Sequence, residues 1–282
     1  MSLIEVRGLG FRYQLADQPI LAKLNFNIER GEFVGVVGQN GSGKTTLCNL
    51  LRRIIPTFIK GEVRGSIRLD GRDLSAYSNG ELAKKVGFVF QNPFIQISGV
   101  KKTVYEEIAF GLENLGVPRN EMHRRIDRVL EQFRIGHLKD RHPAQLSGGQ
   151  SQRVALASVL VMEPEILLVD EPTSQLDPVG TEEVFEALRI LKEEHKTILL
   201  VEHKMDLISA YADRVLVLHN RGIVRDGKTA EVLADPALEQ FGVQMPQVAK
   251  LAYRYQERFG RPLPFIPTTE PGAEEAFKGV LS

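Results

Sequence analysis

The stretch Gly38-Gln39-Asn40-Gly41-Ser42-Gly43-Lys44-Thr45-Thr46 decides the fold of this 282-residue chain. It fits the pattern G-x-x-x-x-G-K-[ST], with the apolar run 33–37 before it and a predicted helix over 45–55 after it. Glycines let the backbone curl so that successive N–H groups face an anion, and the start of the following helix adds positive potential. We therefore predict a strand–loop–helix unit that binds phosphate groups, in preference to a chance match on a glycine-rich turn.

Further apolar patterns indicate the rest of the core. Runs suited to strands buried on both faces lie at 86–90, 166–169, 197–201 and 215–218. Apolar residues at helical spacing form two sets, Ile126/Val129/Leu130/Phe133 and Val184/Ala187/Leu188/Leu191. Alternation typical of half-buried strands occurs at Ile4/Val6 and Leu24/Phe26/Ile28. These patterns predict an α/β fold, with a mixed central sheet, helices on both faces and an antiparallel β portion near the start.

The chain is predicted to divide near residue 228. Residues 1–227 would form the main domain, with a helical subdomain at about 92–155, because the mostly helical stretch 105–143 interrupts the succession of strands. Residues 228–282 would form a C-terminal appendage that serves dimerisation. In it, Val248, Leu251, Ala252 and Tyr255 share one helical face, and Phe277, Val280 and Leu281 suggest a second short helix.

Charge and composition restrict the partners. Lys+Arg and Asp+Glu each number 36, so the zero net charge gives no support to a nucleic-acid or anionic-lipid surface. Cys48 is the single cysteine, which we interpret as a packed residue without a role, and a cytoplasmic setting fits it. No apolar run approaches the roughly 20 residues that span a bilayer, and residues 1–12 lack the pattern of a secretion signal. Any work at a membrane is therefore expected to pass through partner proteins.

Two carboxylates end the apolar run 166–169. Asp170 is expected to hold Mg²⁺ together with the Thr45 hydroxyl, while Lys44 neutralises the β and γ phosphates of a nucleotide. Glu171 is expected to orient and deprotonate the attacking water, and a positioned base is worth about 10²–10⁴ in rate. The alternative is a strand that simply stops at a solvated acidic turn. The phosphate-binding stretch favours the catalytic interpretation, because ligands bind at the ends of strands in such sheets.

A second motif, Leu146-Ser147-Gly148-Gly149-Gln150, opens a predicted helix over 150–161 and resembles another anion-binding helix start. Here the chain resembles the ATP-binding-cassette (ABC) ATPases, a branch of the P-loop NTPase fold. The resemblance implies an ATP hydrolase with ATP and Mg²⁺ as cofactors. It also implies that Ser147, Gly148, Gly149 and Gln150 contact ATP bound to a second subunit. One subunit with one phosphate loop has no need of a second such loop for the same nucleotide.

Other residues match the family one by one. Tyr13 would stack on adenine, Gln91 would sense the γ-phosphate and metal, and Asp177 would lie in the loop that crosses the dimer interface. His203 would contact the γ-phosphate and act in catalysis with Glu171, Lys44 and Gln91. The nucleotide contacts implied within the phosphate-binding stretch are Gly38, Asn40, Gly41, Ser42, Gly43, Lys44, Thr45 and Thr46. The competing interpretations are a core tyrosine, a polar residue at a strand end and a structural histidine.

The chain departs from the family pattern twice. Many relatives have alanine where Gln175 stands and threonine where Glu202 stands. Neither change removes a reacting group, and both concern how the dimer interface couples its two sites.

A narrower resemblance lies in Phe90-Gln91-Asn92-Pro93, Gln96, and the runs 104–114 and 115–118. These look like the ATPases of energy-coupling-factor importers, which take up vitamins and transition-metal ions. The resemblance implies three partners: a second ABC ATPase subunit, a transmembrane coupling protein and a membrane substrate-binding protein. It places the chain at the cytoplasmic face of the membrane, as a peripheral subunit.

Alternatives stay open at this point. The chain could serve another importer or an exporter, although exporters often fuse the ATPase to a membrane domain. A soluble ABC protein acting on DNA or ribosomes usually has two cassettes, a long coiled coil or a zinc-binding insert, and none of these patterns occurs in this sequence. A cassette that binds ATP without hydrolysing it would lack Glu171 or the 146–150 motif. The sequence does not name the cargo, and it allows a homodimer or a heterodimer.

Overall fold

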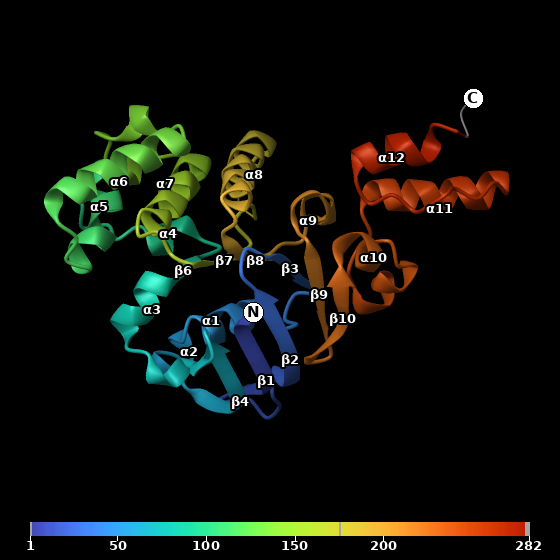
Figure 1. Ribbon diagram of the computed structural model, residues 1–282, viewed down its shortest axis with the longest axis horizontal. Helices are drawn as coiled ribbons and strands as arrows, with labels where there is room; N and C mark the ends of the chain where they lie inside the picture. The colour runs from blue at the N-terminus through green and yellow to red at the C-terminus, as the bar shows by residue number, and fades with distance from the viewer. Residues whose placement is uncertain (1, 175, 280–282) are drawn as a thin grey trace.

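The computed structural model describes residues 2–174 and 176–279, and its centre is a mixed sheet (Figure 1). The strands run in the order β10 (Gly222–Lys228), β9 (Arg214–His219), β3 (Phe33–Gly38), β8 (Thr197–Val201), β7 (Ile166–Asp170) and β6 (Val86–Val89). Neighbours from β9 to β6 are parallel, and β10 is antiparallel to β9. All residues of β3, β6, β7 and β8 are buried, as their continuous apolar runs predict.

The predicted antiparallel portion forms a second sheet. Its order is β2 (Leu21–Glu29), β1 (Ser2–Tyr13), β4 (Gly61–Leu69) and β5 (Arg72–Asp73), with every pair antiparallel. The apolar face of β1 and β2 shares a buried cluster with Val34 and Val36 of β3 and with Leu47 of the following helix. The second sheet therefore supports the strand and helix between which the phosphate-binding stretch lies.

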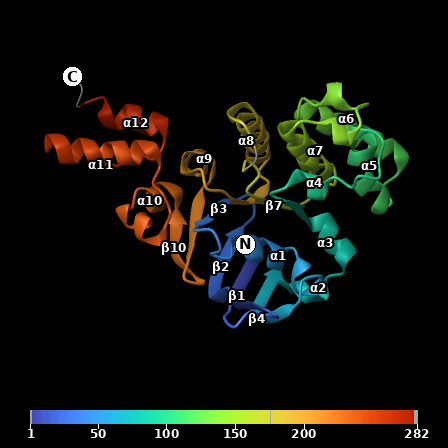
Figure 2. The same ribbon diagram turned by 180° about the vertical axis from the view of Figure 1, so that it is seen from behind.

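Helices surround the sheets. They are α1 (Lys44–Leu51), α2 (Ile54–Thr57), α3 (Asn79–Lys85), α4 (Pro93–Gln96), α5 (Val104–Asn114), α6 (Arg119–Gln132), α7 (Gly148–Leu160), α8 (Pro178–Glu193), α9 (Met205–Tyr211), α10 (Thr229–Leu233), α11 (Gln247–Phe259) and α12 (Glu270–Phe277). Short 3₁₀ turns occupy 74–76, 136–138, 143–145 and 236–241. Figures 1 and 2 show α4–α7 grouped on one side of the central sheet and α11 and α12 on the other.

Two helix boundaries differ from the predicted ones. The helix predicted over 45–55 ends at Leu51, because Arg53 has a φ of 59° and breaks the helical path before α2. The helix predicted over 150–161 begins two residues earlier, at Gly148, because Ser147 caps it.

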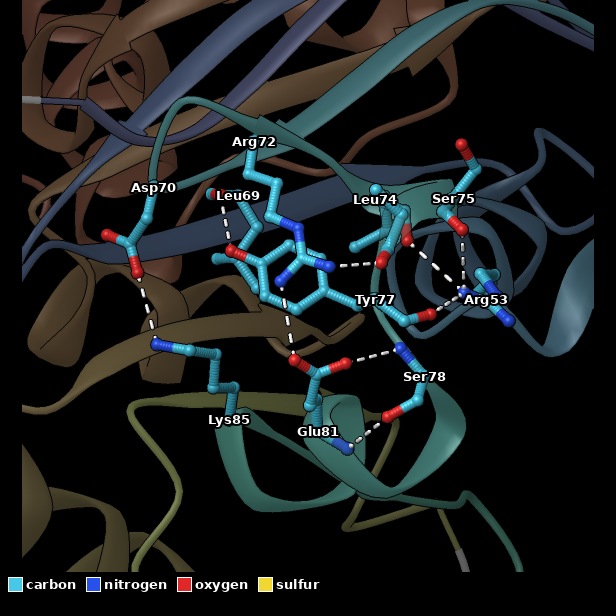
Figure 3. A network of polar contacts seen from close by, with 11 residues as sticks. Arg53, Leu69, Asp70, Arg72, Leu74, Ser75, Tyr77, Ser78, Glu81 and Lys85 are labelled. Atoms are coloured by element: carbon cyan, nitrogen blue, oxygen red, sulfur yellow. Dashed lines mark hydrogen bonds and ion pairs between the residues drawn. The ribbon is translucent and has the colours of Figure 1, made fainter.

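A polar network joins the second sheet to the region before β6 (Figure 3). The Tyr77 hydroxyl donates to the Leu69 carbonyl at 2.9 Å, and Arg72 pairs with Glu81 at 3.3 Å. The Arg53 guanidinium donates hydrogen bonds to carbonyl oxygens of the 74–77 turn, and Lys85 forms an ion pair with Asp70 at 3.2 Å. These contacts tie the turn after β5 to the loop after β4, which fixes the second sheet relative to the central one.

The first part of the predicted appendage packs into the main core. Leu233, Leu238, Val243 and Ala249 belong to the same buried cluster as the central strands and the helical region. Within α11, Ala249 and Ala252 are buried, whereas Leu251 is 57% exposed. The helical face predicted to include Leu251 is therefore rotated from the buried one. The predicted Val280 and Leu281 lie outside the described residues.

Candidate active site

The phosphate-binding stretch forms the loop between β3 and α1. Gly38, Gly41 and Gly43 have φ values of 155°, 79° and 101°. A Cβ at Gly38 would lie 2.4 Å from the Leu218 carbonyl oxygen, and one at Gly43 would lie 2.5 Å from the Leu21 side chain. At Gly38 and Gly43 a side chain is thus excluded both by steric contact and by the backbone conformation. The loop keeps the curled shape that directs its N–H groups toward a bound anion.

A cavity of about 420 Å³ lies beside this loop. Its lining includes Tyr13 and Gln39, together with Asn40, Gly41 and Ser42 of the loop. The hydroxyl groups of Tyr13 and Thr46 are 2.8 Å apart, and the Tyr13 ring meets Phe11 edge-on with centroids 4.8 Å apart. Tyr13 therefore both packs on the second sheet and lines the cavity. Its stacking on adenine stays a prediction.

Lys44 is buried at the start of α1. Its Nζ donates to the carbonyl oxygens of Gly38 and Gln39, each at 3.0 Å. Burial lowers the pKa of Lys44, while the charges of Glu171 and Asp170 oppose that shift. The ammonium group is held on the loop itself, within reach of any anion that the loop binds.

Asp170 is the last residue of β7 and is 3% exposed. Its Oδ1 is buried without a hydrogen-bond partner. Burial raises the pKa of Asp170, and a hydrogen bond with Thr45 works in the opposite direction. A carboxylate oxygen in this state fits a bound cation, and carboxylate with hydroxyl oxygen is the donor set that Mg²⁺ prefers. Asp170 and Thr45 therefore fit a magnesium ion, and their binding of one stays a prediction.

Glu171 is held by two side chains from neighbouring strand ends. Its Oε1 lies 2.8 Å from His203 Nε2, and its Oε2 accepts from Gln91 Nε2 at 2.8 Å. Gln91 follows β6, Glu171 follows β7 and His203 follows β8, and these three strands are adjacent. Glu171 itself has a φ of 45°, an uncommon conformation that its N–H bond to the Val201 carbonyl, 2.9 Å, helps to hold. The structure thus brings the predicted base and its two neighbours together.

The 146–150 motif builds a capped helix start. Ser147 Oγ accepts from the Gln150 N–H at 3.4 Å, and Gln150 Oε1 accepts from the Ser147 N–H at 3.1 Å. Because the serine oxygen accepts in this capping box, its O–H stays available as a donor. The described residues that line the cavity beside the phosphate loop do not include Ser147–Gln150. A nucleotide of the same chain would therefore leave this motif unused.

Asp177 caps α8, its Oδ1 accepting from the Gly180 N–H at 2.7 Å. The first turn of α8 also packs directly on the 146–150 motif, since a Cβ at Gly149 would lie 3.5 Å from Gly180 Cα. Gln175 lies outside the described residues.

The structure adds contacts that the sequence did not predict. Glu202 is buried and accepts a hydrogen bond from the Thr173 hydroxyl, and burial raises the pKa of Glu202. The only sequence signal was the departure from threonine at this position. Farther along, Gly242 lies against the phosphate loop, because a Cβ there would fall 2.0 Å from Gln39 Nε2. Nothing in the sequence indicated that contact.

Among residues 2–174 and 176–279, no helix is long and apolar enough to cross a membrane.

Comparison with known proteins agrees with this geometry. The ABC transporter family model matches residues 21–174. A putative ABC transporter ATP-binding protein of Pyrococcus abyssi is 44% identical over 260 residues, covering 92% of each chain. The energy-coupling factor transporter ATP-binding protein EcfA1 of Enterococcus faecalis is 38% identical over 273 residues, covering 96% of this chain and 95% of the relative.

Two solved structures share the fold. One is CbiO1 from Clostridium perfringens, described as part of the ABC transporter complex CbiONQ, with a TM-score of 0.74, 32% identity and coverage of 92% of this chain and 96% of that chain. The other is the dimeric ATP-binding cassette MJ0796 in a post-hydrolysis state bound to ADP and Pi. It has a TM-score of 0.69 and 28% identity, and the match covers 80% of this chain and 98% of that chain.

A phosphate loop, a buried carboxylate at a strand end and a glutamate held beside it define a P-loop ATPase. The chain belongs to the ABC transporter family of ATP-binding proteins, and it is similar to the ATPases of energy-coupling factor transporters. It is accordingly an ABC-type ATP hydrolase.

Proposed function

We propose that this chain is the ATP-hydrolysing subunit of an energy-coupling-factor importer for a vitamin or a transition-metal ion. The observation that carries the catalytic part is Glu171, held between Gln91 and His203 beside the unpaired oxygen of Asp170. The relatives EcfA1 and CbiO1 support the importer branch.

When bound, Mg²⁺ supplies positive charge that offsets the negative charge of the phosphates. Lys44 exchanges its carbonyl partners, Gly38 and Gln39, for phosphate oxygens. Glu171 orients a water molecule for attack and accepts its proton. Gln91 and His203 keep the Glu171 carboxylate in place, and His203 is proposed to contact the γ-phosphate.

The site of one chain is half of a working unit in this proposal. Ser147–Gln150 serve ATP bound to a second subunit, since they stand apart from the cavity of their own chain. The capped helix start offers the Ser147 hydroxyl and positive potential to that nucleotide. MJ0796, a relative of this chain, has been solved as a dimer. ATP therefore acts as the ligand that favours the closed pair.

Residues 228–282 are proposed to help hold the two ATPases together. Beyond the part that packs into the main core, α11 exposes Leu251 at 57% and Phe259 at 59%, and Phe265 after it is 42% exposed. Tyr255 links α11 to α12 through Phe277, with ring centroids 5.2 Å apart. Large apolar side chains that remain exposed on a packed helix pair suit a contact with a second subunit.

The surface beside Gln91 is proposed to receive the transmembrane coupling protein at the cytoplasmic face of the membrane. Three apolar side chains there are largely exposed: Phe94 at 57%, Ile95 at 70% and Val100 at 71%. Phe94 and Ile95 lie on α4, which Gln96 anchors by accepting from the Phe90 N–H at 3.1 Å and donating to the Ala155 carbonyl at 3.1 Å. A contact made at α4 would therefore be transmitted to the residues around Gln91.

The substitution Ile95→Glu tests this docking surface. It is expected to weaken co-purification with a co-expressed coupling protein by about 10–100-fold, because a charge would be buried in an apolar contact. The basal ATPase rate of the isolated chain should stay within about twofold, since the Ile95 side chain is largely exposed and is not among the described residues that line the cavity beside the phosphate loop. The control is Phe58→Glu, a 74% exposed apolar residue after α2. Equal loss in both variants, or none in Ile95→Glu, would argue against docking at α4.

A further inference from the structure

Three consecutive residues after β8 bind three side chains of one segment, Glu171–Thr181. The Glu202 carboxylate accepts from the Thr173 hydroxyl, and His203 Nε2 lies 2.8 Å from Glu171 Oε1. Lys204 Nζ donates to the Thr181 hydroxyl at 3.0 Å. The segment begins with the base and ends in the first turn of α8.

The Glu202–Thr173 contact is shielded from water, whereas in the other outer contact Thr181 is buried and Lys204 is exposed. Glu202 is 3% exposed, Thr173 is 1% exposed and Thr181 is 7% exposed. Hydrogen bonds of this kind are costly to leave unmade, because the buried partner has no water to turn to. Each contact therefore holds its part of the segment in one position.

The described residues of this segment, 171–174 and 176–181, also bond one another. The N–H groups of Ser174 and Leu176 bond the carbonyls of Glu171 and Thr173, each at 3.3 Å. Asp177 caps α8 through Gly180, and Gly180 packs backbone to backbone on Gly149 of the 146–150 motif. A shift at one end of the segment is thus passed to Asp177 and to Gly149.

We propose that Glu202 and Lys204 are positioning residues that fix the interface segment Glu171–Thr181 to the strand end carrying His203. They make the base, Asp177 and the 146–150 motif move as one unit with His203. The nucleotide site of one subunit is thereby coupled to the motif that serves its partner. This inference rests on the proposed sandwich dimer.

This arrangement explains why a carboxylate at position 202 differs in function from the threonine of many relatives. The hydroxyl oxygen of a threonine stands two carbon atoms closer to the backbone than the carboxylate oxygens of a glutamate, so it would not span the same gap to Thr173. The longer glutamate side chain reaches the hydroxyl from the end of β8. We therefore assign the departure from the family pattern to a contact that anchors the start of the interface segment.

The test compares kinetic constants of full-length variants. Lys204→Met and Thr181→Val are each expected to lower kcat for ATP hydrolysis about tenfold, with KM for ATP unchanged within about twofold. The double variant should fall no further, because both changes remove the same contact. Lys196→Met, just before the opposite end of β8, should leave both constants unchanged. The role of Lys204 would be overturned if the two reductions in kcat multiply in the double variant. It would also be overturned if Lys204→Met keeps the wild-type kcat.

Glu202 is tested by conservative rescue. Glu202→Gln keeps an oxygen that accepts from Thr173 and should retain kcat within about twofold. Glu202→Leu should lower kcat about tenfold, and Thr173→Val should reproduce that loss in case the leucine variant does not fold. If Glu202→Gln loses as much as Thr173→Val, or if Thr173→Val keeps wild-type kcat, the hydrogen bond does not position the segment.

Failure of this inference is separable from failure of the dimer. ATP-dependent pairing is measured independently, on the Glu171→Gln variant. If that variant pairs and Lys204→Met retains wild-type kcat, the coupling role alone is lost. If it never pairs, the proposed dimer is lost as well.

Discussion

Glu171→Gln is expected to lower the rate of ATP hydrolysis by about 10²–10⁴-fold while ATP remains bound. The glutamine amide is isosteric and can still hydrogen-bond Gln91 or His203, so the site keeps its shape. It cannot accept the proton of the attacking water. Phosphate release at saturating ATP measures the rate, and a filter or calorimetric assay measures binding. The control Glu62→Gln changes a carboxylate that pairs with Arg12 and Arg64 and is not among the described residues that line the cavity beside the phosphate loop.

The same variant reports the assembly. Light scattering at low protein concentration should give the 31.6 kDa chain mass without nucleotide and twice that mass with Mg-ATP. Hydrolysis blocked at the bound state traps the closed pair, because ATP is then buried between the two subunits. A dimer already present without ATP would indicate that residues 228–282 hold the pair. A monomer with ATP bound under all conditions would contradict a homodimer.

Lys44→Ala is expected to weaken ATP binding by about 10–100-fold, because charge-assisted hydrogen bonds contribute about 1.5–3 kcal/mol. The fold should not be destabilised, since burial lowers the pKa of Lys44 and so disfavours the charged lysine in the folded chain. That cost is present in full below the folded-state pKa of Lys44. Between the folded-state pKa and the ordinary value of 10.5 the unfolded chain binds more protons, so the free energy of unfolding rises with pH. In Lys44→Ala the free energy of unfolding should not show this rise with pH.

Calorimetric titration with ATP and thermal unfolding at neutral pH check both parts of this prediction. Lys60→Ala is the matched control, because Lys60 Nζ also donates to two backbone carbonyls, those of Pro56 and Thr57, but is exposed. Its removal should leave ATP binding unchanged. Unaltered ATP affinity in Lys44→Ala would contradict a phosphate-binding role for the loop.

The sequence predicted the strands that hold the site because they are buried on both faces. Continuous apolar runs mark β3, β6, β7 and β8, and the phosphate loop, Gln91, the Asp170–Glu171 pair and His203 stand at or just after their ends. Tyr13, Ser147–Gln150 and Asp177 stand elsewhere in the chain. The strands β4 and β10 escaped prediction, since most of β4 is exposed and no residue of β10 is fully buried. Their pairing depends on neighbours distant in sequence, which periodicity does not record.

The contacts around Glu171 also depend on residues that are distant in the sequence. Gln91, Glu171 and His203 were predicted singly, and their common position follows from the order of β6, β7 and β8, which no local pattern states. Glu202 appeared only as a departure from a family pattern. Its partner Thr173 lies 29 positions earlier, and only the folded sheet brings the two together. Likewise, the exposed Leu251 could not be separated from the buried Ala252 by helical spacing alone.

The contact between Gly242 and Gln39 affects whether the C-terminal segment of this chain can be replaced by that of another ATPase. Position 242 has a φ of 68°, which favours glycine, and a Cβ there would displace the exposed side chain of Gln39. A C-terminal segment taken from another ATPase would meet the phosphate loop at this point. The side chain at position 39 would then have to adjust to it. The C-terminal segment and the nucleotide site are thus in direct contact, although some 200 residues separate them along the chain.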